Sequence, residues 1–127
     1  QEMSTAVQYK LPIKIFILNN QYMGMVRQWQ ELLHEKNYSE SYTAALPDFV
    51  KLAEAYGCVG IQATKPDELD EKINEMINTK EPVIFDCRVD PAENCYPMIP
   101  SGKPHNQMLL GPEDEKEEVT DEGKTLV

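Results

Sequence analysis

At residues 15–20 the chain reads Ile15-Phe16-Ile17-Leu18-Asn19-Asn20, an apolar run that ends in two asparagines. A nearly continuous apolar run is typical of a strand that is covered on both faces, as in a parallel sheet. Side-chain oxygens at the carboxyl end of such a strand lie where α/β proteins bind ligands. Amide oxygens suit a hard cation such as magnesium that bridges a diphosphate. Paired asparagines also form simple turns, so the ligand interpretation depends on the surrounding sequence.

The surrounding sequence alternates helices with strands. Apolar spacing predicts helices over residues 1–9, 25–35, 47–56 and 67–78, and strands over residues 13–18, 58–63 and 82–89. We expect Pro47 and Pro66 in the first turns of their helices and Gly57 as a left-handed C-cap. This order predicts an α/β fold with a doubly wound parallel sheet and right-handed crossovers.

Two side-chain patterns on these helices carry further expectations. Asp48 and Glu54 are expected on the solvated face of the helix over residues 47–56. The apolar stripe of the helix over residues 67–78 is expected to comprise Leu69, Ile73, Met76 and Ile77.

The end of the chain differs in composition from residues 1–90. Prolines recur from Pro91 to Pro112, which predicts an extended C-terminal segment over residues 91–127 without a convincing regular element. From about residue 112 the chain carries seven acidic residues against two lysines, which is typical of a solvated, loosely ordered end. Residues 1–90 are therefore expected to form a partial α/β domain, because the chain opens directly on a helix, without the strand that should precede it.

Charge and hydropathy exclude several classes of partner. The net charge of −10 and the pI of about 4.6 argue against nucleic-acid binding through a general electrostatic field. The sequence has no signal peptide and no apolar run of membrane-spanning length, so no membrane partner is expected. Cys58, Cys87 and Cys95 lack paired or metal-type spacing, and the first two fall in predicted strands as buried residues. This cysteine usage suits the cytoplasm.

Several motifs together resemble the C-terminal thiamine-diphosphate-binding domain of the acetolactate (acetohydroxyacid) synthase catalytic large subunit, in its bacterial form. The resemblance spans Gln1 to about Gly111. It rests on Ile17-Leu18-Asn19-Asn20, Gly24-Met25-Val26, Gln28-Trp29-Gln30, Leu46-Pro47-Asp48-Phe49, Leu52-Ala53-Glu54-Ala55 and Pro97-Met98-Ile99-Pro100-Ser101-Gly102. Paired asparagines mark thiamine-diphosphate enzymes generally, whereas Gly-Met-Val-x-Gln-Trp with Met-Ile-Pro-Ser-Gly is more specific.

The resemblance implies a role for particular residues around the cofactor. Asn20 would give its side-chain oxygen to Mg²⁺, and Tyr22 its backbone carbonyl. Asn19 and Gly24 would lie against thiamine diphosphate, and the missing side chain of Gly24 would permit close backbone approach. Met25 would pack beside the reacting carbon of the cofactor.

It also implies a substrate pocket. Trp29 and Met25 would line the pocket that selects the second 2-keto acid, and Ser101 and Gly102 would fold over its entrance. Each has a plainer alternative, since Trp29 can serve as a core anchor and Met25 as core filler. Arg27 could bind a substrate carboxylate, but a surface cation is the favoured interpretation.

The implied activity is the condensation of two pyruvates, or of pyruvate with 2-ketobutyrate, with loss of CO₂ in valine, leucine and isoleucine biosynthesis. The implied complete enzyme is a homodimer or tetramer with a small regulatory subunit, and it binds FAD outside this chain. The family's Gly-Asp-Gly turn and its activating glutamate also lie outside the chain. No catalytic residue is therefore expected here, and the chain alone is expected to be inactive.

Two alternatives stay open from the residues. One is another thiamine-diphosphate enzyme, such as a pyruvate oxidase or glyoxylate carboligase, against which Trp29 and residues 98–102 argue. The other is a cofactor-free α/β interaction module in which Asn19-Asn20 is only a turn.

Overall fold

The computed structural model describes residues 1–112 of the chain. The expected loose order of the acidic end falls on residues 113–127 and so lies outside the described part. The chain divides into two compact units. We call residues 1–21 and 44–91 the sheet unit, and residues 22–43 with the segment from residue 92 the α2 unit.

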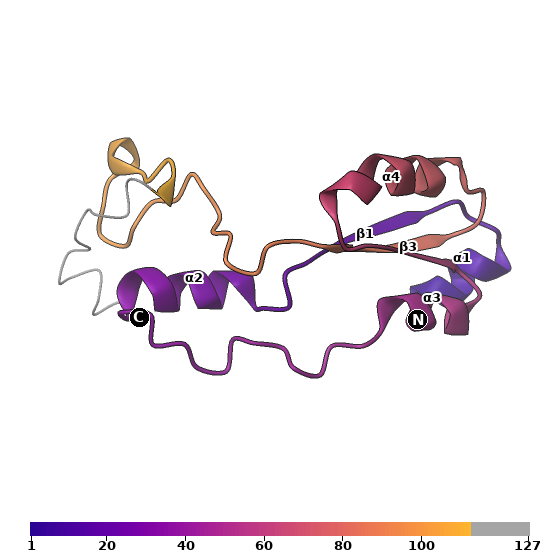
Figure 1. The fold of residues 1–127 in the computed structure, drawn as a ribbon, viewed down its shortest axis with the longest axis horizontal. Coiled ribbons are helices and arrows are strands. Elements are labelled where there is room, and N and C mark those ends of the chain that lie inside the picture. The colour runs from indigo at the N-terminus through magenta and orange to yellow at the C-terminus, as the bar shows by residue number, and fades with distance from the viewer. Residues whose placement is uncertain (113–127) are drawn as a thin grey trace. The chain divides into compact units, whose positions relative to one another are not determined.

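The sheet unit is built on three parallel strands, which confirms the predicted α/β class. The strands are β1 (Lys14–Asn19), β2 (Val59–Ala63) and β3 (Val83–Arg88), in the order β1-β3-β2. Helices α1 (Glu2–Gln8) and α3 (Phe49–Tyr56) lie on one face, and α4 (Leu69–Asn78) lies on the other (Figure 1). Helices thus cover both sides of the sheet, as in a doubly wound fold.

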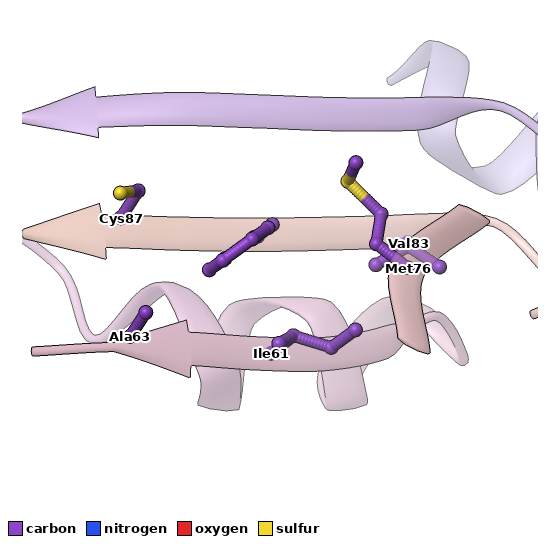
Figure 2. Packing of buried hydrophobic residues seen from close by; sticks show 6 residues of the cluster. Ile61, Ala63, Met76, Val83 and Cys87 are labelled. Carbon is purple, nitrogen blue, oxygen red and sulfur yellow. The ribbon is translucent and has the colours of Figure 1, made fainter. Parts of the chain in front are cut away.

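Two apolar clusters hold the helices against the sheet. The cluster on the α4 side comprises Ile61, Ala63, Met76, Val83, Phe85 and Cys87 (Figure 2). The cluster on the opposite side comprises Ala53, Cys58 and Ile84, with α1 and α3 residues packed against it. Both Cys58 and Cys87 are buried, as the sequence predicts. Removing these side chains from water is the main stabilising contribution to the unit.

Within residues 1–112, strand β1 is covered on one face only, so the prediction that both of its faces are buried is wrong for the described part of the chain. Ile15 and Ile17 pack against the cluster that includes Ile84. On the opposite face Phe16 is 39% exposed and Leu18 is 68% exposed. The physical reason is that α4 packs against β2 and β3, whereas β1 lies at the edge of the described sheet and pairs with β3.

Helix α3 begins two residues later than the proline pattern predicts. Pro47 precedes the helix, and Asp48 is its N-cap, with a side-chain oxygen that accepts from the backbone N–H of Lys51 at 3.1 Å. Asp48 is exposed to solvent, as predicted, and in addition it caps the helix. Gly57 has a φ of +80° and ends the helix as a left-handed C-cap, which confirms that prediction.

Helix α4 also differs from its prediction. Pro66 opens a short 3-10 helix, η1 (Pro66–Glu68), and the α-helix begins only at Leu69. Met76 is buried and Leu69 and Ile73 pack beside it, but Ile77 is 62% exposed. The fourth predicted member of the apolar stripe therefore points to solvent.

The α2 unit contains α2 (Gly24–Leu33) and a short 3-10 helix, η2 (His105–Gln107). The short helix η2 corrects the expectation of no regular element after residue 90. The other described residues of this unit, up to residue 112, form turns and irregular segments, with isolated antiparallel bridges between Tyr22 and Tyr42 and between Met98 and Leu109. Across residues 1–112, no helix has the length and apolar character needed to cross a membrane.

Candidate functional site

The chain makes a tight turn where β1 ends. Asn19 is 5% exposed, and its amide nitrogen donates to Oδ1 of Asp86 at 2.7 Å. Its amide oxygen accepts from the backbone N–H of Gln21 at 3.1 Å, a side-chain to backbone bond two residues along the chain. Gln21 has a φ of +61°, in the left-handed region. Asn19 thus uses both ends of its amide within the sheet unit.

Asn20 lies inside this turn, directly after the last residue of β1 and at the carboxyl end of the parallel sheet. It is half-buried. Of the two asparagines, Asn19 is the one whose side chain stabilises a turn, as the plainer interpretation of the pair predicts. The position of Asn20 is the one at which open α/β sheets bind ligands.

Sequence reasoning missed Asp86, a buried carboxylate at the same end of the sheet. It is 1% exposed in the central strand β3. Oδ1 accepts from Asn19, and Oδ2 accepts from Nε2 of Gln62 at 2.9 Å and pairs with Nε of Arg88 at 3.2 Å. These contacts offset the cost of burying the charge. The available signal was an acidic residue among the apolar residues of positions 83–87.

In the α2 unit, Arg27 is buried, so its interpretation as a surface cation is wrong. It is 7% exposed, its guanidinium lies 2.7 Å from a carboxylate oxygen of Glu31, and it donates to Oδ1 of Asn94 at 3.0 Å. The guanidinium carbon also lies 5.8 and 5.6 Å from the ring centroids of Tyr22 and Tyr38. The paired carboxylate and the aromatic faces stabilise the cation away from water.

Gln28 is a second buried polar residue of α2 that the sequence did not single out. It is 1% exposed. Its Nε2 donates to the backbone oxygen of Cys95 at 3.1 Å and to the sulfur of Met98 at 2.8 Å, and its Oε1 accepts from the backbone N–H of Cys95 at 2.8 Å. Gln28 therefore fastens the segment over residues 95–98 to α2.

A pocket lies beside α2 and the turn that follows it. Its volume is about 790 Å³, and it is lined by Met25, Val26, Trp29, Gln30, Leu33, His34, Glu35 and Asn37. Both residues predicted to line a substrate pocket, Met25 and Trp29, are among them. Trp29 is half-buried and Met25 is 52% exposed, so neither is a fully buried core residue.

The other predicted residues of this unit lie elsewhere. Gly24 is the first residue of α2. Ser101 and Gly102 form a turn closed by a backbone hydrogen bond from Lys103 to Pro100 at 3.1 Å, in which Gly102 has a φ of +80°. These three residues are not among those that line the pocket.

Comparison with known proteins identifies relatives over most of the chain. It is 51% identical over 110 residues to an acetolactate synthase large subunit of Cyanidium caldarium, and 46% identical over 117 residues to that of Haemophilus influenzae. It is 47% identical over 113 residues to the isozyme 3 large subunit of Escherichia coli. These matches cover 86%, 91% and 87% of this chain but only 19%, 20% and 20% of the relatives. The chain thus spans about a fifth of their length.

A solved structure agrees in fold. The thiamine diphosphate-dependent 4-hydroxybenzoylformate decarboxylase of Rhodococcus jostii RHA1 matches with a TM-score of 0.61 and 27% sequence identity, over 69% of this chain and 16% of that one. Residues 1–87 match the family described as thiamine pyrophosphate enzyme, C-terminal TPP binding domain. This match argues against a cofactor-free interaction module. With its parallel sheet and its asparagine turn at the carboxyl end, the chain belongs to the C-terminal TPP-binding domain family of thiamine pyrophosphate enzymes.

Proposed function

We propose that this chain is the part of an acetolactate synthase large subunit that anchors Mg²⁺-thiamine diphosphate and lines the pocket for the second 2-keto acid. The observation that carries the proposal is the shared pocket of Met25 and Trp29. The large-subunit relatives, which are 46–51% identical over most of the chain, support the same assignment.

Asn20 and Tyr22 would hold the metal. An amide oxygen and a backbone carbonyl are hard, neutral donors of the kind that Mg²⁺ accepts when the phosphates of a bound diphosphate complete its coordination. The place of Asn20 at the carboxyl end of the sheet fits such an anchor. Asn19 and Gly24 would lie against the cofactor, and the absence of a side chain at Gly24 would allow a close approach.

When bound, thiamine diphosphate supplies the carbanion chemistry that lets a 2-keto acid lose CO₂ and add to a second 2-keto acid. The residues of this chain would supply placement. Met25 would pack beside the reacting centre and exclude water from it. Trp29 would offer a flat apolar wall to the acceptor, and one additional methylene on such a wall is worth about 1–3 kcal/mol. Ser101 and Gly102 would close over the entrance.

The wider proposal follows the relatives. Pyruvate would be the donor, and pyruvate or 2-ketobutyrate the acceptor, in a cytoplasmic step toward the branched-chain amino acids. The complete protein would bind FAD outside this chain. It would assemble as a homodimer or tetramer with a small regulatory subunit.

The test is Trp29→Leu in the complete protein, supplied with pyruvate and 2-ketobutyrate together. We expect the ratio of 2-aceto-2-hydroxybutyrate to 2-acetolactate to fall more than the rate with pyruvate alone. Phe16→Leu also replaces an aromatic residue with leucine, at a position that does not line the pocket, and it should leave the ratio unchanged. An unaltered product ratio in Trp29→Leu would refute the pocket assignment.

A further inference from the structure

We propose that Asp86 is a positioning residue for the magnesium site, which acts through Asn19 on the place of Asn20. The inference rests on the proposed function of Asn20 as a metal ligand. Asp86 itself makes no contact with the metal in this proposal, and it sets the geometry of the residue that does.

The two oxygens of the Asp86 carboxylate have separate partners. Oδ1 accepts from Asn19 of β1 at 2.7 Å. Oδ2 accepts from Gln62 of β2 at 2.9 Å and lies 3.2 Å from Nε of Arg88. The carboxylate therefore connects the three strands at one end of the sheet. Of these contacts, the hydrogen bond to Oδ1 is the one made by Asn19, the neighbour of Asn20.

The hydrogen bond to Oδ1 of Asp86 fixes the orientation of the Asn19 side-chain amide. A carboxylate only accepts hydrogen bonds, so Asn19 must turn its NH₂ group to Asp86. That orientation leaves the amide oxygen of Asn19 to accept from the N–H of Gln21 at 3.1 Å. With the amide reversed, its oxygen would face the carboxylate and its NH₂ group could not accept from Gln21.

The hydrogen bond from the Gln21 N–H to Oδ1 of Asn19 closes a tight turn that contains Asn20. The turn runs from the side chain of Asn19 to the backbone of Gln21, which has a φ of +61°. On the strand side, the backbone oxygen of Asn19 accepts from the N–H of Val89 at 3.2 Å. Asn20 is thus held between two anchored neighbours, and this is how the charge at Asp86 would limit the positions of the Asn20 amide.

The primary experiment is Asp86→Asn in the complete protein. The probe is Mn²⁺ titrated in the presence of thiamine diphosphate and read by electron paramagnetic resonance, with Mg²⁺ competition. An asparagine at position 86 can either donate or accept, so it would permit both orientations of Asn19. We expect the metal affinity to fall about 10-fold or more, as it does when outer partners of metal ligands are removed.

A matched control separates positioning from general damage. Gln62→Met removes a hydrogen bond to the same carboxylate but leaves the hydrogen bond between Asn19 and Oδ1 in place. Its metal affinity should be unchanged. Equal loss in Gln62→Met and Asp86→Asn would overturn the inference, and so would unchanged affinity in Asp86→Asn.

A reciprocal exchange keeps the test decisive if Asp86→Asn fails to fold. In Asn19→Asp with Asp86→Asn, the carboxylate at position 19 can accept from both the new amide and Gln21. We expect this double variant to regain metal affinity, and a folded double variant without it would contradict the inference. Asn20→Ala tests the proposed function separately, because retained affinity there would refute the ligand role itself.

Discussion

The side-chain amide of Gln28 forms hydrogen bonds with both the backbone N–H and the backbone oxygen of Cys95, at 2.8 and 3.1 Å. One buried side-chain amide thus pairs with both backbone hydrogen-bonding groups of Cys95, as a neighbouring strand would in a sheet. The pairing fastens the extended segment after residue 94 to the helix that carries Met25 and Trp29.

Gln28→Leu should release this segment from α2. The substitution removes the two hydrogen bonds between the Gln28 amide and the Cys95 backbone, and an ordinary hydrogen bond contributes about 0.5–1.5 kcal/mol. Hydrogen exchange of the Cys95 amide, followed by mass spectrometry of the complete protein, should become faster. Glu54→Leu changes an exposed residue of α3 and is the control. Unchanged protection of the Cys95 amide in Gln28→Leu would show that the hydrogen bonds from Gln28 do not restrain the segment.

Gly60→Ala should weaken the contact between β2 and α3. A Cβ at position 60 would lie 2.9 Å from the Cα, the backbone oxygen and Cγ1 of Val50, so the helix would have to shift. Overpacking of this kind costs about 1–3 kcal/mol, measured as a lower midpoint in urea denaturation. Gly111→Ala is the matched control, because nothing lies within 4 Å of a Cβ there. Equal midpoints for the two variants would contradict the close packing of α3.

The N-cap of α3 should give a local dependence on pH. The hydrogen bond from the Lys51 backbone N–H, aided by the Lys51 side chain, lowers the pKa of Asp48 below its ordinary value of 3.8. A carboxyl whose pKa is lower in the folded state contributes stability above its unfolded pKa, and that contribution is lost as the pH falls through the folded value.

The measurement is the protection factor of the Lys51 amide, corrected for intrinsic exchange, between pH 6 and pH 3. Protection should fall with acidification in the parent protein and much less in Asp48→Asn, because asparagine caps without titrating in this range. The same acid response in both proteins would rule out Asp48 as its source.

The three cysteines should differ in reactivity. Burial raises the pKa of the Cys58 thiol, and burial followed by the neighbouring Asp86 carboxylate raises the pKa of the Cys87 thiol. The thiolate is the reactive form, so both should resist iodoacetamide near neutral pH, whereas exposed Cys95 should be modified first. Peptide mapping after brief treatment measures the order. Earlier modification of Cys87 than of Cys95 would contradict the packing of β3.

Local signals sufficed for much of the fold. The apolar runs predicted β1, β2 and β3, and the left-handed C-cap at Gly57 is confirmed. Periodicity failed at Ile77, since it records which side chains share a helix face but not how far the covering sheet extends. The exposed face of β1 was missed for the same reason: an apolar run does not reveal which helices pack over it.

The motifs around Asn19-Asn20 and Gly24-Met25 were enough to identify the family, because they belong to short contiguous stretches of sequence. The roles of Asp86, Arg27 and Gln28 came only from the tertiary structure. Their hydrogen bonds to Asn19, Asn94 and Cys95 each join residues that are 67 positions apart. Local patterns of polarity carry no information about such distant partners, so only the folded chain reveals that these polar groups are buried and paired.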